Sequence, residues 1–187
     1  METAAVPPRV RPAKLLIPAL AGAAVAVGLG VYGHTHDPTG KSIFSLVFTK
    51  TINMKAWFAT GAATLGVFQI LSALRIYGKL PFPRTMPRWL PFAHRMSGTL
   101  AFLIALPVAY HCLWALGFQD TDSRVMWHSI AGCFFFGAFA AKVIVVETKN
   151  LPRLALPVAG GLLFSALVVV WLTSALWFFR EFGFPSF

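Results

Sequence analysis

The chain has 187 residues, of which 57% are hydrophobic and only 12% are charged, too few polar side chains to cover a water-soluble globule of this size. The net charge of +10 would suggest nucleic acid binding in a soluble protein, but here the basic residues lie in short segments between long apolar runs. The charge therefore indicates membrane topology, and no nucleic acid is expected as a partner.

Apolar runs that are long enough to cross a hydrocarbon layer of about 30 Å, as helices of about 20 residues, follow one another along the chain. They cover residues 15–33, 54–78, 92–118, 124–146 and 151–179. None shows the alternating polar pattern of a membrane β-strand. The sequence therefore predicts an all-α protein: a single polytopic bundle of five transmembrane helices over residues 15–182, surrounded by a lipid bilayer. A cleaved signal peptide is the alternative for the first run, which is longer than the usual apolar stretch of about 7–15 residues.

Basic residues mark one side of the predicted membrane. They lie in the tail 1–14 (Arg9, Arg11, Lys14), around the second loop (Arg75, Lys79, Arg84, Arg88, Arg95) and around the fourth loop (Lys142, Lys149, Arg153). By the positive-inside rule this side is cytoplasmic. We therefore expect a bacterial plasma-membrane protein with its amino terminus inside, and with the loop 34–53 and the tail 183–187 outside.

Histidines are the residues most suggestive of chemistry, because a strongly coordinating side chain in an apolar span is costly. His111 lies near the outer end of the third run and His128 near the outer start of the fourth. Since a short loop joins these runs, we expect helices three and four to be antiparallel neighbours with both imidazoles at similar depth. Two such imidazoles are typical axial ligands of a haem b iron, and Gly132, one turn from His128, would leave room beside the ring.

Other pairings stay open. His34 or His36, at the outer end of the first run, could face His111 from a diagonal helix instead, and a second haem is possible. His94 begins the third run about 25 Å from His111 along the axis, so it cannot serve the same iron.

The surroundings of His94 allow several interpretations. The small residues after it (Ser97, Gly98, Ala101) would admit a porphyrin edge, and Arg95 could neutralise propionates or lipid phosphates. Otherwise His94 pairs with a quinone or lies at the headgroup level.

The remaining chemistry-bearing residues carry weaker signals. Cys112 and Cys133 form no CxxC pattern, but beside the outer histidines they leave a copper or zinc site open. Pro107 should bend the third helix and aim His111 inward. The fifth run, without histidine, cysteine or an acid before Glu181, is interpreted as scaffold.

Three segments together resemble known membrane haem proteins: His94-Arg95-Met96-Ser97-Gly98, the stretch from Leu106 to Cys112, and the stretch from Trp127 to Gly132. They look like helices of the ferric-reductase-like and ascorbate-reducible cytochromes b, and closer still to a family of bacterial five-helix membrane proteins. The resemblance implies electron transfer through non-covalent haem b, with His111 and His128 as ligand-type histidines. Those cytochromes carry histidine pairs at two depths, whereas this chain has enough histidines only at the outer depth.

We therefore expect one haem near the outer face, centred on His111 with His128 as its partner, in an oxidoreductase component. The protein would pass electrons to or from a redox partner protein or membrane complex, or serve as a quinol-linked anchor. No glycine-rich dinucleotide fingerprint is present, so flavin or NADPH chemistry would belong to a partner. The alternatives are a transporter or copper- or zinc-handling protein that uses the outer histidines, and a structural subunit of a membrane complex.

Overall fold

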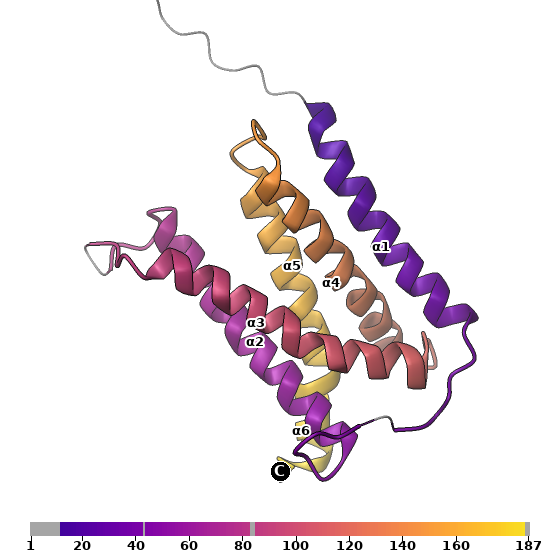
Figure 1. Ribbon diagram of the computed structural model, residues 1–187. Helices are drawn as coiled ribbons and strands as arrows, with labels where there is room; N and C mark the ends of the chain where they lie inside the picture. Colours follow the sequence, from indigo (N-terminus) through magenta and orange to yellow (C-terminus); the bar gives the residue numbers. More distant parts are fainter. Residues whose placement is uncertain (1–11, 43, 83–84, 186–187) are drawn as a thin grey trace, which may run out of the picture.

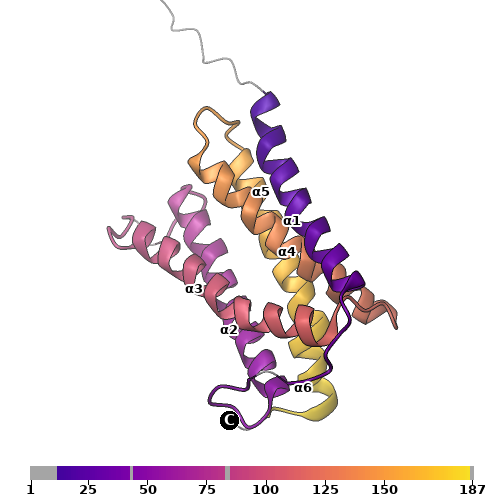
Figure 2. The ribbon, with the colours of Figure 1, turned by 45° about the vertical axis from the view of Figure 1, so that its right-hand side comes forward.

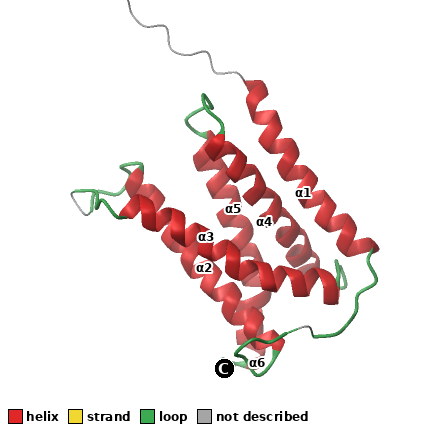
Figure 3. Ribbon diagram, viewed as in Figure 1, coloured by secondary structure: helices red, strands yellow, loops and turns green. Residues whose placement is uncertain are grey.

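The computed structural model describes residues 12–42, 44–82 and 85–185, and within these ranges it contains helices and loops but no strand (Figure 3). Arg9, Arg11, Arg84 and the last two residues of the tail, all used in the topology prediction, lie outside the described residues. The elements in chain order are η1 (Pro12–Leu15), α1 (Leu16–Thr35), α2 (Thr51–Ile76), α3 (Leu90–His111), η2 (Cys112–Leu116), α4 (Ser123–Glu147), α5 (Ala155–Trp171), η3 (Leu172–Leu176) and α6 (Trp177–Phe182) (Figure 1).

Continuous helical segments confirm the five predicted spans. α3 runs on through the π-helical turn η2, and α5 runs on through the π-helical turn η3 into α6. The spans are 20, 26, 27, 25 and 28 residues long, with mean hydropathy from 1.4 to 2.2. Large apolar side chains such as Leu20, Val67 and Leu103 are exposed on their outer faces, as expected where lipid replaces water. The chain is a multi-pass membrane protein.

The spans pack in an order that differs from their order in the sequence. α1 packs on α4, α4 on α5, α5 on α2, and α2 on α3 (Figures 1 and 2). α3 and α4 are consecutive, yet they do not lie against each other along their lengths. The expected contact between these antiparallel helices is therefore limited to a few side chains, because the short connection between them fixes only their ends.

Aromatic side chains fill this gap near the middle of α3. Phe102 of α3 stacks on Phe139 of α4 with ring centroids 3.9 Å apart, and its ring also meets the edge of Phe136 at 5.9 Å. Ring-to-ring contact holds two helix axes farther apart than contact between small residues does. Nearer the end of α3, where these rings no longer fill it, the gap remains open as a cavity.

Pro107 lies inside α3, where it cannot donate the helical hydrogen bond to the Leu103 carbonyl. α3 bends part-way along its length (Figure 2), and the π-helical turn η2 begins five residues after the proline. Gly117, with φ of 71°, ends the span in a conformation that favours glycine. The bend that the proline predicts is therefore present.

Glycines allow the closest helix contacts elsewhere in the bundle. A Cβ atom on Gly22 of α1 would lie 2.7 Å from the Gly137 carbonyl oxygen of α4, and one on Gly66 of α2 would lie 2.8 Å from Leu167 Cδ2 of α5. The small-residue stripe of α2 (Ala59, Ala62, Gly66) is accordingly buried. These stripes bring α1 onto α4 and α2 onto α5. The helices therefore pack closely at these two contacts, whereas a gap remains between α3 and α4.

The α1–α4 contact gives a direct test of this packing. Gly22→Ala should lower the midpoint of thermal unfolding in detergent by at least about 3 °C, because overpacking a close contact costs about 1–3 kcal/mol. Gly28→Ala is the matched control on the same helix, since a Cβ atom there would meet nothing within 4 Å. Equal midpoints for the two variants would contradict the close contact.

Candidate functional site

A cavity of about 290 Å³ lies between α2, α3 with η2, α4, and α5 with η3. It is near the end of the bundle where α1 and α3 finish and α6 ends, which we call the C-terminal end. Small and aromatic side chains form its apolar part (Ala59, Ala62, Ala105, Phe135, Phe136), and its polar lining residues are Lys55, Gln119, Arg124, His128, Ser129, Thr173 and Ser174. The cavity is therefore amphipathic, with its cations in the first turns of α2 and α4.

Both π-helical turns line this cavity. η2 contributes Cys112, Leu113 and Leu116, and η3 contributes Thr173, Ser174 and Ala175. Turns of this kind are rare inside helices and occur frequently at functional sites. Interpreting the fifth span as scaffold therefore missed its contribution. The adjacent hydroxyls of Thr173 and Ser174, in an otherwise apolar run, were the signal that could have revealed it.

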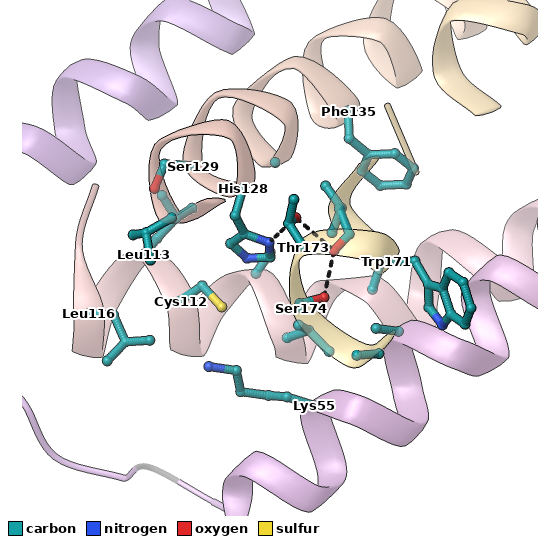
Figure 4. Close-up of a pocket in the computed structure, with 18 of the residues that line it drawn as sticks. Lys55, Cys112, Leu113, Leu116, His128, Ser129, Phe135, Trp171, Thr173 and Ser174 are labelled. Atoms are coloured by element: carbon teal, nitrogen blue, oxygen red, sulfur yellow. Dashed lines mark hydrogen bonds between the residues drawn. The ribbon is translucent and has the colours of Figure 1, made fainter. Parts of the chain in front are cut away.

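His128 is positioned by the start of α4. The Asp122 side chain accepts a hydrogen bond from the Val125 backbone N–H at 2.9 Å and caps the helix. The Ser129 hydroxyl donates to the Gln119 carbonyl at 2.8 Å and fastens the preceding loop. The helix thus begins at Ser123, and His128 reaches the cavity wall in its second turn (Figure 4).

A hydrogen bond between two walls of the cavity, α4 and η3, fixes the His128 ring. Its Nδ1 lies 3.2 Å from the Thr173 hydroxyl oxygen, and that hydroxyl itself lies 2.6 Å from the Val169 carbonyl (Figure 4). Since the threonine proton goes to the carbonyl, the threonine oxygen accepts from Nδ1–H. The tautomer that remains carries its lone pair on Nε2. This is the arrangement of a metal-binding histidine, whose other nitrogen donates to a neighbouring oxygen.

The two cations that line the cavity differ in how they are held. Arg124 donates to the Thr173 carbonyl at 2.9 Å, its guanidinium lies 3.9 Å above the Trp177 ring, and it is 3.9 Å from the Asp122 carboxylate. Lys55 reaches into the cavity from α2 (Figure 4), and among the described residues no hydrogen bond or ion pair engages its ammonium. Lys55 is thus the cation available to an anionic ligand.

His111 lies elsewhere. It is buried, 8% exposed, and its Nδ1 has no hydrogen-bond partner among the described residues. It does not line the cavity that His128 lines, because it lies about 100° around the helix from Cys112, which does line it. The neighbouring loop covers this end of the span, where the N–H groups of Thr39 and Gly40 donate to the carbonyls of residues 114 and 115. The structure therefore does not bring His111 and His128 into one cavity.

His34 and His36 lie at the same end of the bundle, at the end of α1. The His34 ring meets the edge of Phe118 at 6.4 Å, and the His36 ring lies 4.7 Å from Trp114 and 5.1 Å from Tyr32. Four of the five histidines thus gather at the C-terminal end, as the sequence predicts. Only His128 lines the cavity.

His94 links α3 to α2 at the opposite end. Its Nδ1 lies 2.7 Å from the Ser72 hydroxyl oxygen, and Gln69 donates to the His94 carbonyl and, at 2.8 Å, to Ser97. A Cβ atom on Gly98 would lie 3.1 Å from Gln69 Oε1. The expectation that this small face admits a porphyrin edge is wrong, because Gln69 fills the space. The predicted propionate partner Arg95 is exposed.

Small and sulfur-bearing residues complete the cavity wall. Gly132, Cys112 and Cys133 all line it, and a Cβ atom on Gly132 would meet nothing within 4 Å. Gly132 therefore leaves open space one turn from His128. Nowhere in the described ranges do three or more His, Cys, Asp or Glu side chains come together as a metal site, so the copper or zinc alternative has no preformed ligand set there.

The fold and this site define a multi-pass membrane helix bundle with a histidine at the wall of an amphipathic cavity. The chain belongs to a family of unknown function, DUF6529, whose model matches residues 15–186. Comparisons with curated proteins and with solved structures found no match.

Proposed function

We propose that this protein is a membrane haem b protein, with one haem that would be held in the cavity by His128. The observation that carries the proposal is the Nδ1 hydrogen bond to Thr173, which leaves Nε2 as the coordinating nitrogen at an apolar cavity. The resemblance of the His128 segment to the cytochromes b supports the same assignment. A quinone carbonyl fits less well, because Nε2 in this tautomer cannot donate a hydrogen bond.

The other cavity residues suit a flat, apolar group that carries two carboxylates. Phe135, Phe136 and the alanines supply apolar walls, and Gly132 supplies space near the ligand histidine. Arg124 supplies a cation for the propionates. The chemistry of these lining residues therefore fits the group, and the enclosed volume of about 290 Å³ lies just below the range of about 300–1,000 Å³ for ligand pockets.

Each residue has a defined task in this account. Thr173 orients the His128 ring, the phenylalanines keep water from the inner part of the cavity, and Arg124 holds an anionic edge in place. Bound haem would supply one-electron chemistry. The protein would then act as an oxidoreductase component, with a redox protein, a membrane complex or a quinol as its electron partner.

The charge distribution supports an orientation in a bacterial plasma membrane. The described basic residues at the end opposite the cavity are Lys14, Arg75, Lys79, Arg88, Arg95, Lys142, Lys149 and Arg153, with Glu147 as the acid among them. The C-terminal end carries four acids (Asp37, Asp120, Asp122, Glu181) beside its own cations. By the positive-inside rule the end opposite the cavity faces the cytoplasm. The haem would then lie near the outer face, within reach of an external partner.

Substitution of the ligand tests the proposal. His128→Ala should lose nearly all haem from the purified protein, measured by the absorbance of the pyridine haemochrome per chain, because no other imidazole lines the cavity. His94→Leu is the control, since His94 lies at the far end of α3, and it should keep the full haem content. Equal haem contents in the wild type and His128→Ala would contradict His128 as the ligand.

Substitution of Thr173 tests the hydrogen bond to His128 on which the proposal rests. Thr173→Val should weaken haem affinity about 10- to 100-fold, because loss of the partner of a ligating histidine frees its ring and its tautomer. Ser174→Ala is the matched control on the same turn, since this hydroxyl lines the cavity but donates to the Val170 carbonyl. Affinity is measured by titrating haem into apoprotein. An unchanged value for Thr173→Val would exclude the orienting role.

A further inference from the structure

The wall opposite His128 contains no second imidazole. α2 and α4 both pack on α5 but not along each other, so they face one another across the cavity. The α2 side chains that line it are Ile52, Lys55, Ala56, Ala59 and Ala62. A group held by His128 from α4 would therefore meet alanines and one ammonium on its α2 side. This differs from the paired histidines expected from the sequence.

We propose, on the basis of the haem site described above, that the haem iron keeps an open sixth coordination position facing α2. We further propose that this position takes a small ligand, either diatomic or anionic, beside the Lys55 ammonium. The site then binds small molecules as well as passing electrons. His128 is the protein ligand on one side, and the space between the α2 alanines and Lys55 receives the small ligand on the other.

His111 cannot occupy the open position without rebuilding the end of α3. It would have to turn by about 100° around the helix axis, out of a site where it is 8% exposed. The backbone there is also fixed, because the carbonyls of residues 114 and 115 accept hydrogen bonds from the covering loop. The Nδ1 atom of His111, which has no hydrogen-bond partner among the described residues, therefore lies in a separate buried site on the other side of the span.

The remaining candidate ligands from the chain are poor ones. Cys112 lines the cavity as a free thiol, and a thiol binds metal well only after it loses its proton. A protonated Lys55 has no lone pair to give, but it offers three donors and a positive charge. Beside apolar walls, where screening by water is weak, that charge should favour an anion over a neutral ligand of the same size.

The test uses the full-length, haem-loaded protein in detergent and two probes. Carbon monoxide, with the reduced protein, reports whether the position is open; azide, with the oxidised protein, reports the preference for an anion. We expect a high-spin ferric spectrum and saturable binding of both probes. Lys55→Met should weaken azide binding about tenfold, equivalent to about 1.4 kcal/mol, because a charge-assisted hydrogen bond is lost, while carbon monoxide affinity changes less than about twofold.

Matched variants separate the possible outcomes. Lys50→Met removes an exposed lysine one and a half turns away that does not line the cavity, and it should leave both affinities unchanged, as should His111→Ala. A low-spin spectrum without carbon monoxide binding would overturn the open position if His111→Ala, Cys112→Ser or Lys55→Met converted it to high spin. The proposal that His128 holds the haem would then still stand. A protein that binds no haem would overturn both proposals. Equal azide affinities for the wild type and Lys55→Met would overturn the anion preference.

Discussion

The separation of α3 from α4 is the constraint on which the site depends. Two consecutive membrane helices with small residues at facing positions would normally close on each other, and the cavity would disappear. The stacked rings of Phe102 and Phe139 hold the two helices apart near the middle of α3, and Pro107 bends α3 beside the cavity. The glycine contacts of α1 with α4 and of α2 with α5 keep the rest of the bundle tight around the opening. The amphipathic cavity results from the gap between α3 and α4 together with the close packing of α1 on α4 and of α2 on α5.

The hydrogen bond from His128 to Thr173 links two walls of this cavity. It ties α4 to the π-helical turn of the last span and favours the tautomer with its lone pair on Nε2. In a membrane interior, polar groups and irregular helical turns are tolerated where they are buried in protein or line a cavity. The turns η2 and η3 meet that condition, because both face the cavity. The same geometry thus explains why the polar residues of the spans gather there and what they can bind.

Hydropathy alone predicted the five spans, because the length and apolarity of a membrane helix are local properties of the sequence. His128 and Gly132 were also predictable as parts of one site, since residues four apart share a helix face. The hydrogen-bond partner of His128, Thr173, was not predictable, because the depth at which α5 lies against α4 depends on long-range packing. The π-helical turns have no simple sequence signature, and the face that His111 presents depends on which way α3 leans. Four histidines at one end therefore predicted the location of the site but not its pairing.

The haem content of the intact protein tests the central claim most directly. The measurement is the ratio of haem to protein after expression with ample haem and purification in mild detergent, together with the reduced-minus-oxidised spectrum. The account predicts one haem per chain and the α band of a b-type haem, because one described cavity carries one available imidazole. A colourless protein, with a ratio near zero, would contradict it, and a ratio of two would contradict the single site.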